Sequence, residues 1–280
     1  MDLSIIIVSF NTKKLLEECL GSVISSQRLV IRKGLPITDH QSPITEVIVV
    51  DNASGDSSTE MVKKDFPKVI LIKNQDNLGF AQANNQGMKI AKGKYLFLLN
   101  SDTVVKQESL EKLIKFAEKN PGAGIIGARL VNPNGLVQPS VYHFPTLGRA
   151  IREYWLGQKE AYEKYAPKGK KALAVKAVTG AAMLIPRRTI EKIGLLDERY
   201  FMYFEDLDYC QRVKRAGLKV YYLPEAEILH HHGQSAAQTG DKAYQYLIQS
   251  SKIYNGLIKY YLLFLILWIG QKWQSIFGRK

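Results

Sequence analysis

The sequence is poor in cysteine and lacks the glycine-rich loops that commonly hold nucleotides. Its two cysteines, Cys19 and Cys210, are far apart and fit neither a metal nor a redox spacing. Both fall on apolar helical faces, so we interpret them as buried thiols. Neither GxGxxG nor GxxxxGKS/T follows the first expected strand, which argues against dinucleotide dehydrogenases and P-loop NTPases.

Acidic residues are in the minority: 26 Asp and Glu against 39 Lys and Arg give a net charge of +13. Such a surface suits nucleic acid, anionic lipid or a phosphorylated substrate. No helix-turn-helix, zinc-finger or RNA-binding aromatic signature is present. Nucleic acid is therefore the least favoured of these partners.

The sequence also lacks a secretory signal and an apolar run of full membrane-spanning length. It enters an apolar segment at once, with no basic n-region or cleavage site, which predicts a cytoplasmic location. A later apolar block, 262–269, is shorter than the ~20 residues that a span needs. It is flanked by Lys259 and Tyr261 on one side and by Lys272 and Trp273 on the other. These flanks predict a helix lying in the membrane interface; the alternative is a terminal helix packed on the domain or on a second subunit.

Apolar β-branched runs alternate with helix-period segments through the first half of the chain. The 280 residues, 46% of them hydrophobic, are enough for a large core. The nearly continuous apolar runs, typical of strands covered on both faces, are 5–8, 47–50, 69–72 and 95–99. Helices are expected around 15–23, 57–65, 81–91 and 107–119. Repeated strand–helix units predict a doubly wound α/β sheet.

The rest of the chain is less regular. Residues 27–45 are polar, contain two prolines, and are expected to be a loop insertion. Residues 149–171 are rich in Lys, Arg and Tyr and have no clear period. The remaining expected elements are strands at 182–185 and 219–222 and helices at 188–193 and 206–215.

Polar clusters follow the expected strands. They are Ser9-Phe10-Asn11, Asp51-Asn52-Ala53-Ser54, Asn77-Leu78-Gly79-Phe80 and Asn100-Ser101-Asp102. Each alone is an ordinary turn or helix cap. Four at the carboxyl edge of one open α/β sheet favour a ligand site, where Asp51 accepts from a base or ribose and Asp102 lies beside a diphosphate. Mg²⁺ or Mn²⁺ on a diphosphate needs only one or two protein carboxylates.

A second acidic cluster, Phe204-Glu205-Asp206-Leu207-Asp208, opens an expected helix. Asp206 and Asp208 would lie about 200° apart on it, at roughly 100° per residue, and so cannot act as a pair. We expect one to face a cleft and the other to face solvent or cap the helix. The capping role is assigned mainly to Asp208 or Glu205.

In order along the chain, these motifs resemble the inverting glycosyltransferases of family two, which have the GT-A fold, and especially rhamnosyltransferase-like members. The resemblance covers about residues 3–236. The motifs that carry it are Val49-Val50-Asp51-Asn52-Ala53-Ser54, Asn77-Leu78-Gly79-Phe80-Ala81, Leu99-Asn100-Ser101-Asp102, Thr179-Gly180-Ala181 and Phe204-Glu205-Asp206-Leu207-Asp208. It implies a mixed, mainly parallel central sheet flanked by helices over 1–238, followed by a helical, membrane-associating tail over 239–280.

The resemblance also implies roles for individual residues. Asp206 looks like the catalytic base, and Asp102 looks like a metal ligand in a DxD-type motif whose first acid is Asn100 here. His230, ahead of Ser235, matches a histidine that completes the metal shell in some relatives, with a structural hydrogen-bonding role as the alternative; His231 and His232 confuse that alignment. The nucleotide-binding residues would be Ser9, Asn11, Asp51, Asn77, Asn100 and Ser101. The donor and acceptor pocket would include Gly79, Thr179, Gly180, Ala181 and Glu205.

The activity implied is inverting transfer of a sugar to a hydroxyl of a glycan or lipid-linked glycan in cell-surface polysaccharide synthesis. The donor would be UDP-, dTDP- or GDP-linked, with dTDP-rhamnose favoured, and the cofactor Mg²⁺ or Mn²⁺. The enzyme would lie on the inner face of the plasma membrane through its C-terminal tail. The basic, aromatic segment 149–171 would receive a lipid-linked diphosphate sugar, or be a solvated loop.

Two other functions compete with this one. A non-catalytic nucleotide-sugar-binding protein could use the same pocket, although retention of Asp206 beside Asp102 argues against it. A sugar nucleotidyltransferase should carry a basic, glycine-rich triphosphate loop after the first strand, and Ser9-Phe10-Asn11-Thr12 is not such a loop. A processive synthase is disfavoured because multiple spanning helices and a QxxRW-like segment are missing.

Overall fold

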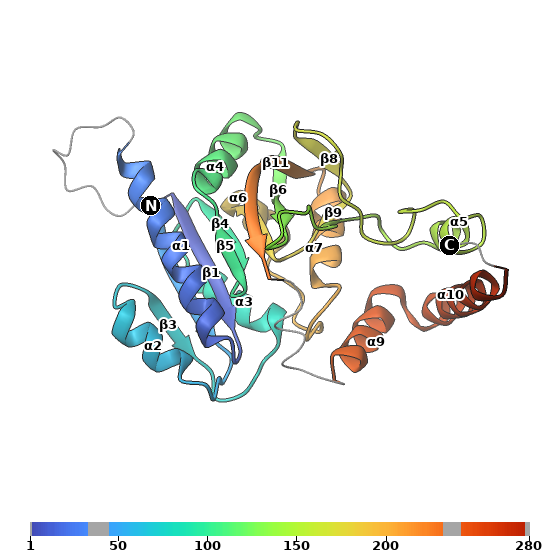
Figure 1. Cartoon of the computed structure of the whole chain (residues 1–280), viewed down its shortest axis with the longest axis horizontal. Coiled ribbons are helices and arrows are strands. Elements are labelled where there is room, and N and C mark those ends of the chain that lie inside the picture. The colour runs from blue at the N-terminus through green and yellow to red at the C-terminus, as the bar shows by residue number, and fades with distance from the viewer. Residues whose placement is uncertain (1, 33–44, 232–241, 278–280) are drawn as a thin grey trace.

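The computed structural model describes residues 2–32, 45–231 and 242–277, and a central sheet flanked by helices forms its body (Figure 1). The strands are β1 (Leu3–Ser9), β2 (Thr45–Asp51), β3 (Ile70–Lys73), β4 (Tyr95–Asn100), β5 (Thr103–Val105), β6 (Ala123–Val131), β7 (Val141–Tyr142), β8 (Leu173–Val175), β9 (Ala177–Val178), β10 (Ala182–Pro186) and β11 (Lys219–His230). The helices are α1 (Lys13–Arg32), α2 (Ser58–Asp65), α3 (Phe80–Ile90), α4 (Ser109–Lys119), α5 (Leu147–Tyr154), α6 (Arg187–Ile193), α7 (Glu205–Arg215), α9 (Lys242–Asn255) and α10 (Leu257–Phe277).

The main sheet has the order β3-β2-β1-β4-β10-β6-β11-β5, with β8 paired to β11. The first four strands are mutually parallel, and β10 is antiparallel to both β4 and β6. Strand β11 runs parallel to β6. A separate two-stranded sheet pairs β7 with β9. The expected mixed, mainly parallel sheet is confirmed.

Both faces of the sheet are buried, which explains the continuous apolar runs of β1, β2 and β4. Successive side chains of a strand point to opposite faces, so Ile5 and Ile7 pack with α1, α2 and α4, whereas Ile6 packs with α3 and α7. Cys19 and Cys210 are both buried thiols, one on each side of the sheet. Burial raises the pKa of the Cys19 thiol to about 12.

Several predicted boundaries are wrong. The expected insertion at 27–45 begins as helix, because α1 continues to Arg32; residues 33–44 lie outside the described parts of the chain. Helix α4 starts at Ser109 rather than at residue 107, and β11 extends far beyond residue 222, to His230. The segment 149–171, which showed no period, contains most of α5.

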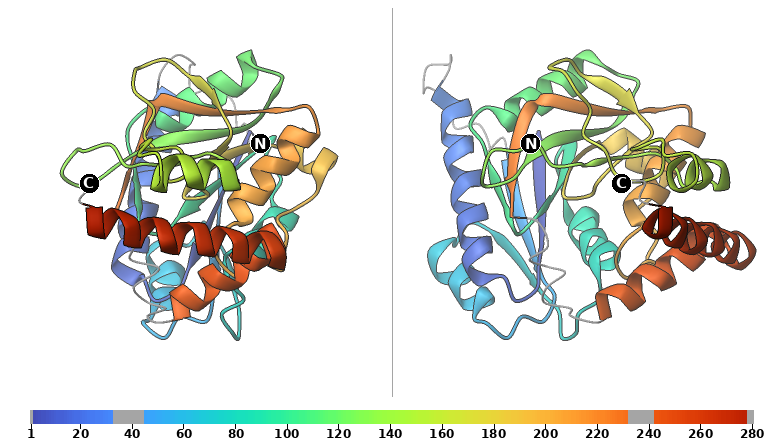
Figure 2. Two further views of the ribbon diagram at one scale, coloured as in Figure 1. Left: turned by 90° about the vertical axis from the view of Figure 1, so that its right-hand side faces the viewer. Right: turned by 45° about the vertical axis from the view of Figure 1, so that its right-hand side comes forward.

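The two C-terminal helices lie beside the body, and α10 packs along α5 (Figures 1 and 2). Trp155 donates from Nε1 to the carbonyl of Ile266 at 3.2 Å, and Lys259 donates from Nζ to the carbonyl of Pro145 at 2.9 Å. No helix within the described ranges has both the length and the apolar character to cross a membrane. The proposed domain boundary at 238/239, His232 and Ser235 lie outside the described residues.

Candidate active site

The carboxyl ends of β1, β2 and β4 bring three predicted site residues side by side. Ser9 is opposite Asp51, and Val8 is opposite Asn100, in consecutive parallel ladders. Neighbouring strands lie about 4.8 Å apart, so the three ends form one continuous edge. Thr12 connects Ser9 to Ser101 at this edge. Its Oγ1 lies 3.0 Å from Ser9 Oγ and donates to Ser101 Oγ at 2.9 Å.

Asn11 and Asp51 are held by a short network at this edge. The Asn11 amide donates to Ser54 Oγ at 2.9 Å, and the Gly55 amide donates to Asn11 Oδ1 at 2.8 Å. The Ser54 amide donates to Asp51 Oδ2 at 3.0 Å. The other carboxylate oxygen of Asp51 is buried and has no hydrogen-bond partner, so it is available to a ligand.

Asn77 and Gly79 join the edge through the side chain of Asn52, whose Nδ2 donates to Asn77 Oδ1 at 3.2 Å and to the Gly79 carbonyl at 3.1 Å. Gly79 has φ +81°, and a Cβ there would collide with the carbonyl and ring of Phe201. The next amide, of Phe80, donates to that same carbonyl at 2.6 Å. A glycine is required at position 79 because its backbone packs directly against the backbone of Phe201.

Asp102 and His230 lie against each other in the interior. Asp102 Oδ1 is 3.3 Å from His230 Nε2, and both side chains are buried. His230 Nδ1 is 2.9 Å from Gln138 Oε1, while Gln138 Nε2 donates to the His230 carbonyl at 2.7 Å. Because the glutamine oxygen can only accept, Nδ1 must be the donor, and the Nε2 of a neutral ring then turns its lone pair toward the carboxylate.

This arrangement fits a divalent cation. Asp102 Oδ1 is buried without a hydrogen-bond partner and lies 3.3 Å from His230 Nε2, and carboxylate oxygens and imidazole nitrogens are both common ligands of divalent cations. Buried Asn100 Oδ1 also has no hydrogen-bond partner. Among the described residues no group of three His, Cys, Asp or Glu side chains could enclose a metal. Oxygen atoms of a bound diphosphate would have to complete the shell.

Asp206 is connected to the same edge by backbone hydrogen bonds. The Asn100 amide donates to the Ala181 carbonyl at 3.0 Å, and the adjacent Gly180 amide donates to Asp206 Oδ2 at 3.2 Å. The backbone amide of Thr179 donates to the carbonyl of Ser140 at 3.0 Å, which also holds this turn in place. The segment 179–181 therefore spans from the end of β4 to the start of α7.

The two neighbouring acids of α7 both have perturbed ionisation. Burial raises the pKa of Asp206, against the opposing effect of Lys164 and three backbone amides. Burial, followed by the charge of Asp206, raises the pKa of Glu205 well above its usual range, and Glu205 Oε2 has no hydrogen-bond partner. A carboxylate with a raised pKa is a stronger base, which suits removal of a proton from a hydroxyl.

The expected separation of Asp206 from Asp208 is observed, but the expected capping is not. Asp208 Oδ2 accepts from Arg212 Nε at 2.8 Å on the outside of the helix. The N-cap position is occupied by Phe204, with no side-chain capping bond, and Glu205 is the first helical residue. Glu205 is instead buried beside Asp206, where its pKa responds to that neighbour.

Sequence reasoning assigned no role to Thr12, Asn52 or Gln138, all of which organise predicted site residues, although Asn52 belongs to the predicted polar cluster after β2. Their signal was weak, because a single hydroxyl or amide beside a strand end is an ordinary turn residue.

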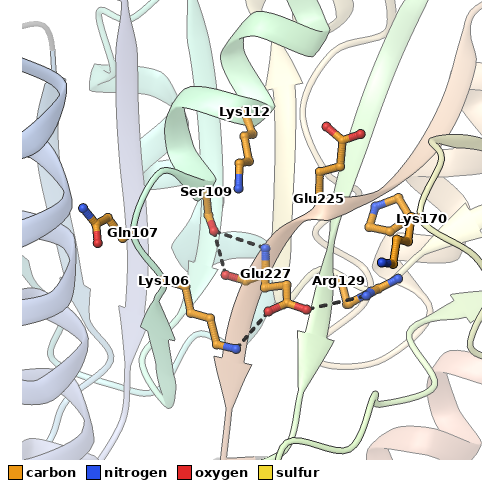
Figure 3. A pocket seen from close by; sticks show the side chains of 9 residues that line it. Lys106, Gln107, Ser109, Lys112, Arg129, Lys170, Glu225 and Glu227 are labelled. Carbon is orange, nitrogen blue, oxygen red and sulfur yellow. Dashed lines mark hydrogen bonds and ion pairs between the residues drawn. The ribbon is translucent and has the colours of Figure 1, made fainter. Parts of the chain in front are cut away.

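A basic hollow of about 290 Å³ also lies outside this edge (Figure 3). There Glu227 bridges Lys106 Nζ at 2.9 Å and Arg129 Nη1 at 3.5 Å, so two of its cations are already compensated.

Fold and edge together define a class: a GT-A-type α/β enzyme with polar side chains along one sheet edge, a candidate cation pair and a buried carboxylate. The family model "Glycosyl transferase family 2" matches residues 4–194. The chain belongs to that family, and it is a nucleotide-sugar glycosyltransferase.

Individual relatives agree with this assignment. The chain is 30% identical over 212 residues to N-acetylglucosaminyl-diphospho-decaprenol L-rhamnosyltransferase of Mycobacterium tuberculosis, covering 69% of this chain and 68% of that one. It is 27% identical over 183 residues to rhamnosyltransferase WbbL of Escherichia coli, covering 62% and 68%. The solved mannosyltransferase PcManGT of Pyrobaculum calidifontis, in complex with GDP-Man and Mn²⁺, has a TM-score of 0.60 at 16% identity and covers 89% of this chain and 63% of its own. That likeness shows the fold.

Proposed function

We propose that this enzyme is an inverting, metal-dependent transferase that moves a sugar from a nucleotide donor to a hydroxyl of a lipid-linked glycan. The observation that carries the proposal is the hydrogen-bonded path from the β4 end, with its metal-ligand candidate Asp102, to the buried carboxylate of Asp206. It favours two separate acidic functions on one edge. Rhamnose, with a dTDP carrier, is the first donor to test, because two relatives are rhamnosyltransferases by name.

The donor nucleotide would lie along the ends of β1 and β2. Asp51 Oδ1, which has no internal partner, would accept from the base or ribose, and Ser9 and Asn11 would line the slot. Asn77, Asn100 and Ser101 would border the diphosphate, with Gly79 and 179–181 around the sugar. Asp102 and His230 would hold Mn²⁺ or Mg²⁺, which neutralises charge on the leaving diphosphate when bound.

Asp206 would act on the acceptor. Its two oxygens are held by the amides of Gly180 at 3.2 Å and Leu207 at 2.8 Å, so the carboxylate cannot rotate freely. With the acceptor hydroxyl within ~3 Å, Asp206 would take its proton as the oxygen attacks the anomeric carbon. The nucleoside diphosphate leaves from the opposite face, and the configuration inverts. Glu205, kept protonated by burial, would leave a single negative charge at this point.

The tail over 239–280 would hold the enzyme against the anionic inner face of the plasma membrane. The face of α10 turned away from α5 exposes Leu257, Ile258, Tyr261, Leu262, Phe264, Leu265 and Trp268. Lysines accompany its aromatic rings: Lys272 Nζ is 4.2 Å from the ring centroid of Trp268. An apolar face with aromatic and basic residues is typical of helices lying in a lipid interface.

The test is a panel of UDP-, dTDP- and GDP-sugars with Mn²⁺, followed by detection of released nucleoside diphosphate. We expect slow donor hydrolysis without acceptor and faster release with a prenyl-diphosphate-linked sugar. Asp206→Asn should lower acceptor-dependent turnover by about 10²-fold or more while Mn²⁺-dependent nucleotide binding persists. Asp208→Asn is the matched control, since it lies two residues away but faces Arg212. Normal turnover by Asp206→Asn would refute the assignment of the base.

A further inference from the structure

Four cations lie near the small sheet of β7 and β9, and one of them, Lys164, also acts on Asp206. Arg149 lies on α5, Lys164 in the following loop, Lys176 before β9, and Lys214 near the end of α7. Within the described residues, none of the four forms a salt bridge with a carboxylate. This separates the cluster from the hollow of Figure 3, where Lys106 and Arg129 both pair with Glu227.

Lys176 and Lys214 are brought together by the packing of α7 on β9. Cys210 Sγ lies 3.9 Å from the carbonyl of Val178, and Tyr142 pairs with Ala177 across the small sheet. The adjacent ammonium of Lys214, then desolvation, and then the charge of Arg149 lower the pKa of Lys176. Like charges this close repel, and a multivalent anion between them would remove the repulsion.

The cluster lies at a defined distance from the base. Lys214 is eight residues beyond Asp206 on α7, or about 12 Å along the helix axis. Lys164 is nearer: its Nζ lies 5.1 Å from the ring centroid of Tyr142, and its charge lowers the pKa of Asp206. The cations therefore extend from near Asp206 toward the C-terminal end of α7.

Aromatic and apolar surfaces adjoin this cationic path. The rings of His143 and Tyr165 stack with centroids 4.7 Å apart, and the backbone of Tyr165 pairs with Val141. Lys214 Nζ lies 5.9 Å from the ring centroid of Phe144. Arg149 is on the helix that packs against α10, whose opposite face is the exposed apolar surface described above.

We propose that Arg149, Lys164, Lys176 and Lys214 form an acceptor-side subsite for the diphosphate of a prenyl-diphosphate-linked sugar. The sugar hydroxyl reaches Asp206, the diphosphate lies among the four cations, and the hydrocarbon continues toward α10 and the lipid. The inference rests on the proposed function for the direction of the acceptor. The diphosphate of the donor occupies a different place, at the ends of β1 and β4.

The subsite is tested by calorimetry with geranyl diphosphate, geraniol and inorganic pyrophosphate, in EDTA so that metal-dependent donor-site binding is suppressed. The wild type should bind geranyl diphosphate, bind pyrophosphate more weakly, and not bind geraniol. Lys176→Gln/Lys214→Gln should weaken geranyl diphosphate binding roughly 10- to 30-fold. Lys63→Gln/Lys64→Gln, with the same loss of charge in the last turn of α2, should bind like the wild type.

Turnover separates this inference from the proposed function. In the Lys176→Gln/Lys214→Gln variant the KM for a prenyl-diphosphate-linked acceptor should rise by a similar factor, with unchanged donor hydrolysis and unchanged melting temperature. Equal binding by the variant and the wild type, or no binding of geranyl diphosphate by the wild type, overturns the subsite and leaves the proposed function standing. Loss of binding to phosphatidylglycerol vesicles with geranyl diphosphate binding intact would instead make the cluster a membrane contact. Absence of donor hydrolysis throughout would refute the proposed function itself.

Discussion

At the scale of single residues, the site is organised around oxygens that have no internal hydrogen-bond partner. Asp51 Oδ1, Asn100 Oδ1, Asp102 Oδ1 and Glu205 Oε2 are all buried in this state. An unsatisfied buried oxygen costs about 1–3 kcal/mol, so four near one edge represent a substantial loss of stability. A nucleotide at Asp51, a cation at Asp102 and a proton on Glu205 would each recover part of this lost stability.

The link between Gln138 and His230 gives a prediction about the metal. Gln138→Leu removes the acceptor that fixes His230 Nδ1 as the donor, so Nε2 would no longer be held with its lone pair toward Asp102. Removing such a supporting partner typically weakens metal affinity about 10- to 100-fold. We expect this loss in calorimetry of nucleoside diphosphate with Mn²⁺, and no change in EDTA. The exposed Gln107→Leu is the control. If Mn²⁺ strengthens nucleoside diphosphate binding equally in both variants, the role of Gln138 is contradicted.

Glu205 gives a prediction about pH. Its pKa in the folded protein is raised, so between the unfolded and folded pKa values the unfolded chain loses a proton that the folded protein keeps. The wild type therefore loses stability as pH rises above about 4.3. Glu205→Gln cannot ionise, so its stability advantage should grow by at least about 1 kcal/mol from pH 5 to pH 8. Urea unfolding at both pH values measures this, with Glu191→Gln as an exposed control; a constant difference would show that Glu205 is ionised in the fold.

At the scale of secondary-structure elements, the turn that leads into Glu205 and Asp206 is supported from the C-terminal tail. Tyr203 and Phe204 both have left-handed backbones, with φ 71° and 67°, immediately before Glu205. Such conformations are strained in residues with bulky side chains and persist only when their surroundings hold them. Helix α9 does so: Tyr246 stacks on Phe201 with centroids 4.1 Å apart, and Ser250 Oγ donates to the Met202 carbonyl at 2.8 Å.

The opposite side of the same turn is held at Gly79, which gives a prediction at this scale. Gly79→Ala would place a methyl group against the Phe201 backbone while keeping a positive φ, so we expect a loss of stability of about 1 kcal/mol or more. Gly148→Ala in α5 has open space around it and should be neutral or slightly stabilising. Denaturant midpoints of the two variants make the comparison. Equal midpoints would mean that the Phe201 turn can move away without cost.

Much of the edge could be predicted because β1, β2 and β4 are buried on both faces and so have uninterrupted apolar runs. Strand β6 could not be predicted, because Gly124 and Gly127 interrupt its apolar pattern. In the structure a Cβ at Gly124 would crowd Val213, and a Cβ at Gly127 would crowd Val178. Glycine commonly marks a break in a strand, whereas here it makes room for packing. The pairing of Gln138 with His230 was also out of reach, since 92 residues separate them and neither lies in a periodic segment that indicates contact.

At the scale of the whole molecule, the positive charge and the exposed apolar surface meet around α5 and α10. The charge of +13 alone would suit any polyanion. Ile258 is 82% exposed and Trp268 is 47% exposed, on a helix whose other side is packed on α5. Figure 2 shows α10 lying alongside the body. This asymmetry favours an anionic bilayer as the surface that covers α10.

Vesicle flotation tests this directly. The wild type should float with vesicles of phosphatidylcholine and phosphatidylglycerol and bind pure phosphatidylcholine weakly, with binding reduced by salt because exposed charges are screened. Ile258→Gln/Trp268→Gln should lower the partition coefficient by about tenfold or more, since each apolar side chain contributes roughly 1.5–3 kcal/mol when fully buried. Leu136→Gln/Ile90→Gln removes exposed apolar side chains elsewhere without changing charge and should float normally. If both variants float equally, or if the wild type is instead a concentration-dependent dimer that ignores vesicles, then a second protein surface, not lipid, covers α10.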